Sequence, residues 1–132
     1  MQLRIDALLT GREGTLMEPP PGLFASSLST DEWEPDPDVG GLMHILCDVP
    51  GVQAGFTRYD SVPAPVHWTP PVRETFMIIE GAAWIEITGG ATLDLHAGDV
   101  ASLAAGTETT WHITTPFREF WVLSGQSAAL DG

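Results

Sequence analysis

The sequence predicts an all-β barrel or sandwich, and three observations lead to that prediction. Short apolar runs follow one another from residue 41 onward. Turn-forming pairs separate them, such as Pro50-Gly51, Gly89-Gly90 and Gly98-Asp99. No long segment has the periodicity of an amphipathic helix. Short strands at this spacing, joined by glycine-rich turns, are typical of β-sandwiches and barrels.

The N-terminal part of the chain has a different texture. Prolines interrupt residues 18–22 and 35–37, so we expect residues 1–40 to form an extended arm and a first strand. Residues 41–132 are expected to form the barrel, within one structural domain overall. Trp33 stands alone in a polar run and is expected to anchor the arm, either on its own barrel or on a neighbouring subunit.

The apolar runs give the expected strands, in chain order, as residues 42–47, 52–59, 73–80, 82–87, 91–95, 100–103, 111–114 and 117–123. A turn is expected at Gly81, which would make residues 73–87 a hairpin. Pro116 is expected to separate the last two strands. Gly55 is a candidate bulge, and residues 60–71 are read as a proline-rich loop.

Composition and charge limit the classes of partner. The chain has 132 residues, of which 18 are acidic and five are arginine, with no lysine, so its formal charge is -13. Such a chain repels phosphate backbones and anionic membranes, and we expect neither nucleic acid nor membrane as a partner. The single cysteine, Cys47, is expected to be a buried apolar residue without a disulfide. We expect no signal peptide and no membrane span, and therefore a cytoplasmic protein.

The strand that begins at Arg73 carries the most informative residue. Glu74 shares a face with Phe76 and Ile78, because side chains alternate along a strand. A carboxylate on an apolar face needs a partner or a position at the rim. Besides water, the candidate partners of Glu74 are His67, Arg73 and Arg118, although a surface salt bridge is the simpler role for each arginine.

The run from Phe76 to Ile79 is apolar on both faces of its strand. In a two-layer β fold this indicates that both faces are covered. The second cover is either the N-terminal segment or a second subunit, so a homodimer is expected.

Glu74, followed by six residues and then Gly81, resembles the second half of the first cupin motif, Gly-x5-His-x-His-x3–4-Glu-x6-Gly. His67 falls on the first histidine position of that motif. Thr69 replaces the second histidine, and Ser61 replaces the leading glycine.

The second cupin motif, Gly-x5-Pro-x-Gly-x2-His-x3-Asn, is matched in its glycines by Gly98 and Gly106. Ala104 replaces the proline, Thr109 the histidine and Ile113 the asparagine. The resemblance covers roughly residues 40–124. It implies a single-domain cupin, which is a double-stranded β-helix or jelly-roll-like barrel.

The segment that includes Trp111 and, later, Arg118-Glu119 before an aromatic strand is more similar to one group of cupins. That group is related to ureidoglycine aminohydrolase and to the ethanolamine-utilisation cupins. Glu119 stands where the group often has a lysine.

Cupins of the usual type bind Mn, Fe, Ni or Zn through three histidines and a glutamate. This chain keeps His67 and Glu74 and replaces the other two ligands, so no metal ligand is assigned, and a divalent metal near these two residues stays open as a weak site. If Thr109 points into the barrel, strand alternation turns His112 to the other side.

A ligand pocket is expected at the mouth of the barrel, the usual position in small barrels. The residues expected to line it are His67, Glu74, Phe76, Thr109, Trp111 and Trp121. The tryptophans would give it flat apolar walls, unless they are core residues.

Three functions remain open. The first is the binding of a small polar metabolite in the barrel without a tight metal. The second is a metal-assisted, aminohydrolase-like enzyme that acts on a small nitrogen-containing or carboxylate metabolite. The third is a metal-free isomerase or epimerase in which His67 and Glu74 act as acid and base.

Overall fold

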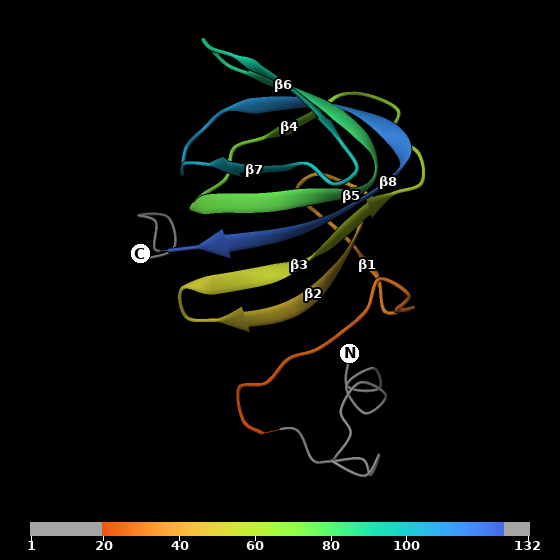
Figure 1. Cartoon of the computed structure of the whole chain (residues 1–132), viewed down its shortest axis with the longest axis vertical. Helices are drawn as coiled ribbons and strands as arrows, with labels where there is room; N and C mark the ends of the chain where they lie inside the picture. Colours follow the sequence, from red (N-terminus) through yellow and green to blue (C-terminus); the bar gives the residue numbers. More distant parts are fainter. Residues whose placement is uncertain (1–19, 126–132) are drawn as a thin grey trace. The chain divides into compact units, whose positions relative to one another are not determined.

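The computed structural model describes residues 20–125 and shows only β-strands and their connections in that range (Figure 1). The strands, in chain order, are β1 (Glu34–Pro35), β2 (Leu42–Val49), β3 (Val52–Tyr59), β4 (Val66–Trp68), β5 (Arg73–Ile87), β6 (Thr92–His96), β7 (Val100–Leu103) and β8 (Thr109–Ser124). The predicted all-β fold is therefore confirmed. Residues 20–125 contain no helix with the length and apolarity that crossing a membrane requires.

The chain divides into two units between Trp33 and Glu34. In the first unit, Trp33 Nε1 donates a hydrogen bond of 2.7 Å to the carbonyl oxygen of Thr30, so a local turn holds the indole. Its expected role as an anchor stays a prediction. The start of the expected arm, residues 1–19, and the C-terminal residues 126–132 lie outside the described structure.

The second unit includes residues that the sequence assigned to the arm. Strand β1 pairs with β2, and the hydroxyl of Tyr59 donates a hydrogen bond of 3.0 Å to the carbonyl oxygen of Val39. Residues 34–40 are therefore tied to the barrel by backbone and side-chain bonds.

Two long strands organise the sheet. All pairings are antiparallel along the path β1-β2-β3-β8-β5-β6, while β4 pairs with β8 and β7 pairs with β5. Strands β5 and β8 pair over nearly their whole length, from Arg73 opposite Ser124 to Ile87 opposite Thr109. Both strands curve strongly, and their neighbours differ from one end to the other (Figure 1). Because these two paired strands curve, the strands that flank them at each end surround a common interior.

The expected hairpin at Gly81 is wrong, because β5 continues through this residue to Ile87. The register shifts on both sides of Glu80, and Gly81 has a φ of 81°. A Cβ at position 81 would collide with the carbonyl oxygens of Thr114 and Pro116. The glycine therefore bends the strand instead of ending it, as glycines at β-bulges do.

The expected break at Pro116 is wrong as well, because β8 runs without interruption from Thr109 to Ser124. Pro116 lies opposite Gly81, where both strands bend, and its lack of an N–H group is tolerated where the ladder shifts. Strand β4 lies inside residues 60–71, which the sequence predicts to be a loop. A bulge is expected at Gly55 of β3, but the irregularity lies on its partner strand β2, where the register shifts between Ile45 and Cys47.

The inward faces of β5 and β8 form the core. Phe76, Ile78, Ile85 and Phe117 are all at most 2% exposed, and Trp111 packs among them. Cys47 lies on β2 and is only partly buried, which corrects the expectation that it is a core residue.

The bend at Gly81 makes a prediction about stability. We expect Gly81→Ala to lower the free energy of unfolding by about 3 kcal/mol, because the methyl group adds steric overlap to the cost of a positive φ. Gly89 has a similar φ of 73°, but a Cβ there would have no neighbour within 4 Å. Gly89→Ala should therefore cost only about 1 kcal/mol. Urea unfolding of both variants measures the difference, and equal losses would contradict the role of the bend.

Candidate functional site

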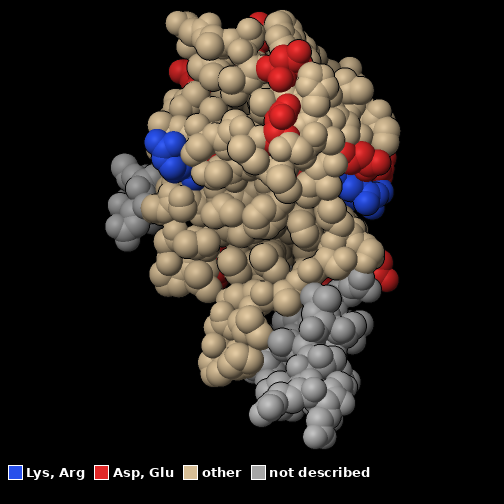
Figure 2. Space-filling view, viewed as in Figure 1, with Lys and Arg blue, Asp and Glu red and all other residues tan. Residues whose placement is uncertain are grey.

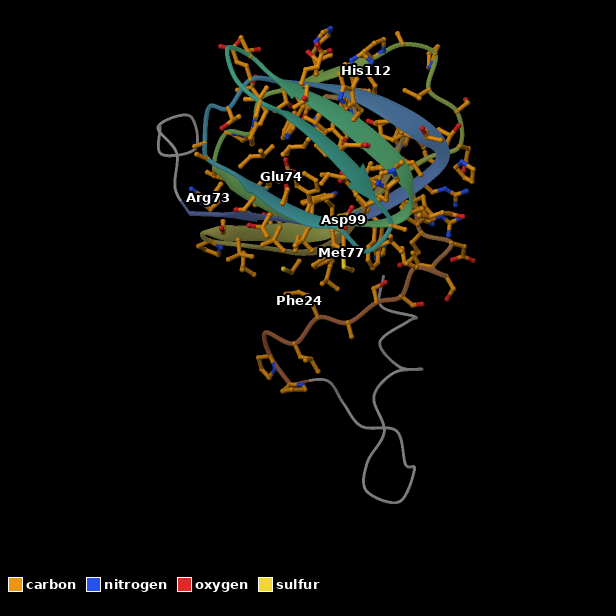
Figure 3. All side chains as sticks on the ribbon, turned by 45° about the horizontal axis from the view of Figure 1, so that its top comes forward. Phe24, Arg73, Glu74, Met77, Asp99 and His112 are labelled. Carbon is orange, nitrogen blue, oxygen red and sulfur yellow. The ribbon has the colours of Figure 1, made fainter. Side chains whose placement is uncertain are left out.

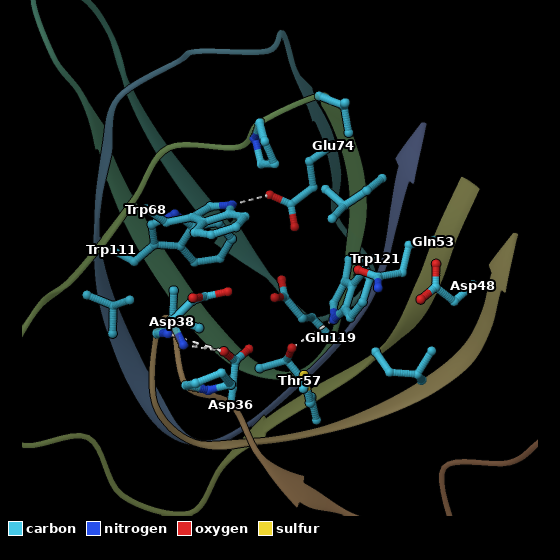
Figure 4. Close-up of a pocket in the computed structure, with 18 of the residues that line it drawn as sticks. Asp36, Asp38, Asp48, Gln53, Thr57, Trp68, Glu74, Trp111, Glu119 and Trp121 are labelled. Atoms are coloured by element: carbon cyan, nitrogen blue, oxygen red, sulfur yellow. Dashed lines mark hydrogen bonds between the residues drawn. The ribbon is translucent and has the colours of Figure 1, made fainter. Parts of the chain in front are cut away.

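The barrel unit contains a partly open cavity of about 640 Å³, which is lined mainly by residues of β1, β2, β3, β4, β5 and β8. Three tryptophans form much of its wall. In Figure 4, Trp68 and Trp111 lie on one side and Trp121 lies on the other, with Glu74 and Glu119 between them. A cavity of this size is in the range of small-molecule sites.

Hydrogen bonds fix each of the three indole groups. Trp68 Nε1 donates to Oε1 of Glu74 at 2.7 Å, and Trp111 Nε1 donates to the Thr109 hydroxyl at 2.9 Å. Trp121 Nε1 donates to the Thr57 hydroxyl at 2.8 Å. Since all three N–H groups have partners, the indoles offer the cavity their apolar ring surfaces.

Glu74 is 5% exposed, and its partner is Trp68. Burial raises the pKa of Glu74 from about 4.5 to about 7, because it disfavours the charged carboxylate, while the hydrogen bond from Trp68 opposes part of this rise. The three side chains expected to satisfy Glu74 all bond elsewhere.

Strand alternation explains why the two arginines do not reach Glu74. Arg73 Nη1 donates to the Ser102 hydroxyl at 3.0 Å, and Arg118 Nε lies 3.4 Å from a carboxylate oxygen of Glu80. Both arginines flank inward-facing positions, so they point outward. Figure 3 shows Glu74 inside the barrel, while Arg73 and His112 lie toward its outside. The predicted outward orientation of His112 is confirmed, since its Nε2 contacts Glu86 at 2.6 Å.

The structure corrects the expected position of His67. Its side chain is exposed on the outside of β4, where Nδ1 lies 3.1 Å from the Thr110 hydroxyl. Trp68 is the next residue and therefore points inward. His67 and Glu74 do not meet, so the structure does not form the acid and base pair that was considered for an isomerase.

Of the other expected site residues, Trp111 and Trp121 line the cavity. Phe76 is buried behind the wall, with its ring 5.0 Å from that of Trp111. Thr109 is also buried and supports the wall, because its hydroxyl donates to the carbonyl oxygen of Trp68 and accepts from Trp111.

Glu119 is the main residue that the sequence analysis missed. It is 7% exposed, it lines the cavity, and its Oε2 is buried with no hydrogen-bond partner. Burial raises the pKa of Glu119 well above its usual range, and the nearby charge of Glu74 raises it further. Alternation could have identified it from the sequence, because a residue two positions before Trp121 lies on the same face of the strand.

The charged side chains of the described lining are all acidic. Besides Glu74 and Glu119, the described lining includes four more carboxylates and no Arg, Lys or His; these four are Glu34, Asp36, Asp38 and Asp48. Tyr59 also lines the cavity, and burial, followed by the charges of Glu119 and Asp36, raises its pKa far above the usual range. Tyr59 therefore stays neutral.

The residues present do not fit the metal of a typical cupin. The side chain of His67 lies outside the cavity, and the Thr109 hydroxyl is engaged by Trp68 and Trp111. Thr69, at the second histidine position, is exposed and does not line the cavity, so Glu74 alone remains of the four expected ligand positions. Within residues 20–125, no three His, Cys, Asp or Glu side chains are grouped so that they could hold a metal ion.

Comparison with known proteins places this geometry in a wider context. Residues 59–121 match the EutQ-like cupin domain. The structure is similar to that of a candidate ethanolamine utilization protein Q from Salmonella typhimurium, with 22% identity and a TM-score of 0.66. That match covers 88% of this chain and 90% of the other. The fold is that of a cupin.

Other cupin-like structures resemble the chain as well. A protein from Ralstonia eutropha described as a candidate mannose-6-phosphate isomerase is 20% identical, with a TM-score of 0.60, over 77% of this chain and 98% of its own. KdgF from Halomonas is 15% identical, with a TM-score of 0.56, over 72% and 89% of the two chains. No curated protein matches the chain. At these identities the structural likeness shows the fold alone.

The buried carboxylate of Glu74 predicts a pH-dependent stability. Its folded pKa lies above its unfolded value, so its stabilising contribution is complete below about pH 4.5 and is lost as the pH rises through about 7. We expect the free energy of unfolding of wild type, relative to Glu74→Gln, to fall by about 3 kcal/mol between pH 4.5 and 8.5. Glutamine keeps an oxygen that can accept the bond from Trp68.

Chemical unfolding at several pH values measures this difference. Glu80→Gln is the matched control, because Glu80 is exposed on the same strand. A wild-type curve parallel to that of Glu74→Gln over this whole range would show that Glu74 is not held in a desolvated site.

Proposed function

We propose that this cupin binds a small polar metabolite inside its barrel and that it does so without a tightly bound metal. The observation that carries the proposal is the pair Glu74 and Glu119, two buried carboxylates that face a cavity between fixed indole walls. Burying charged groups is costly, and a core that served stability alone would be expected to hold apolar side chains there.

The enzymatic alternatives lack comparable support. A metal-assisted, aminohydrolase-like reaction would need ligands that this cavity does not supply, because Thr69 and Thr109 replace two of the histidines and His67 lies outside. An isomerase that uses His67 with Glu74 lacks the contact between them. The names of the similar structures concern different activities, so they do not select a ligand.

A cavity-blocking variant tests the proposal. We expect at least one member of a panel of neutral, anionic and cationic metabolites to bind wild type in ligand-observed NMR. Leu123→Trp places an indole in the lining and should weaken that binding about tenfold or more. Thr92→Trp adds the same side chain at an exposed position on β6 and should leave binding unchanged.

Two outcomes would contradict the proposal. One is a wild-type protein that binds no member of the panel. The other is a folded Leu123→Trp variant that binds as tightly as wild type.

We also propose that the protein forms a homodimer. Phe76 and Ile78 fill the interior, while Met77 on the opposite face of β5 is 39% exposed and its cross-strand neighbour Val100 is 66% exposed. In the view of Figure 2, acidic side chains lie in the upper part of the visible face and arginine side chains lie at its two sides, with an uncharged area between them. An exposed apolar area of this kind supports an interface.

Mass measurement in solution tests the dimer. We expect light scattering after gel filtration to give about twice the 14.2 kDa of one chain. The double variant Met77→Glu/Val100→Glu should shift the protein to the monomer, whereas Thr92→Glu should not. A monomeric wild type at micromolar concentration would contradict the proposal.

A further inference from the structure

Glu119 Oε2 is the least satisfied atom of the cavity. It is buried and has no hydrogen-bond partner. Its neighbour across the ladder is Thr57, whose hydroxyl oxygen already accepts the bond from Trp121. A buried acceptor without a donor costs about 1–3 kcal/mol. The described lining offers no cationic side chain that could satisfy it, so a donor to this oxygen comes from water or from a ligand in the cavity.

The charge of the lining restricts what can enter. All six acids of the described lining are negative when ionised, and the described lining contains no Arg, Lys or His that could balance them. An anion would be repelled by this lining, while a cation would be attracted to it. Asp36 and Asp38 lie across the cavity from Glu74 in Figure 4 and extend the same field.

The walls add a second preference for a cation. Their indole N–H groups already have partners in Glu74, Thr109 and Thr57, so a ligand meets the ring surfaces. Cations are attracted to the faces of tryptophan rings, and apolar groups also pack against these faces. The cavity thus combines acceptors at its centre with surfaces suited to a cation that has an apolar body.

We propose that the ligand is a primary ammonium ion with an apolar or aromatic body, whose N–H groups are held by Glu74 and Glu119 and whose body packs on Trp68, Trp111 and Trp121. This assignment rests on the proposed binding function and specifies its ligand class. A quaternary ammonium ion has no N–H group and leaves Glu119 Oε2 unpaired. An alcohol supplies a single donor and no charge.

Four ligands with the same ring test the assignment by titration calorimetry at pH 7.5 on the full chain. They are benzylamine, benzyl alcohol, benzoate and benzyltrimethylammonium. We expect benzylamine to bind about tenfold or more tightly than the alcohol or the quaternary ion, because charge-assisted hydrogen bonds are worth more than neutral ones. We expect no detectable binding of benzoate. Equal or tighter binding of any of the other three overturns the assignment.

Variants then identify the residues responsible. In Glu119→Gln and in Glu74→Gln, the ratio of amine to alcohol affinity should fall toward one, since the charge is removed and the shape is kept. Glu80→Gln, an exposed change on the same strand, should keep the wild-type ratio. Thermal unfolding confirms that each variant is folded. A wild-type ratio in both cavity variants overturns the assignment.

The two levels of the proposal fail in different ways. If neutral or anionic members of the metabolite panel bind and Leu123→Trp blocks them, while benzylamine does not bind, the binding function stands and the ammonium assignment is wrong. If neither the panel nor the four benzyl compounds bind wild type, both are wrong.

Discussion

The ladder between β5 and β8 is the constraint on which the rest of the structure depends. It joins the strands from Arg73 opposite Ser124 to Ile87 opposite Thr109. Once this register and its shift at the Gly81 bend are set, alternation decides which residues of both strands face the interior. Glu74, Glu119 and the two tryptophans of β8 face the interior for this one reason. A slip of one residue would exchange the cavity lining for Arg73, Arg118 and their neighbours.

Much of the fold could be predicted from the sequence, because turns and apolar runs are local signals. The predictions were wrong at residues whose role depends on contacts between distant strands. Gly81 and Pro116 look like breaks when each is read alone, yet they face each other at one bend in a continuous ladder. Local sequence does not reveal that pairing, so one strand was divided into two at each position.

The site was predicted less completely, because the prediction depends on knowing which face of its strand each residue occupies. Glu74 was found because its strand is long and clearly alternating. Its partner Trp68 was missed because β4 is only three residues long and lies among prolines, so its facing could not be set from pattern. Glu119 was judged by its place in a family motif, although its spacing from Trp121 already put it on the inward face.

Thr109 carries a consequence for how such a cupin could change. It stands at a metal-ligand position, but its hydroxyl joins the carbonyl oxygen of Trp68 to the indole of Trp111. A histidine there would remove both bonds and would still find His67 on the outside of the barrel. Building the usual cupin metal site here would therefore require several changes at once, and the change at Thr109 would disturb the cavity wall. The role of Thr109 in the cavity wall is therefore coupled to the absence of a histidine at this ligand position.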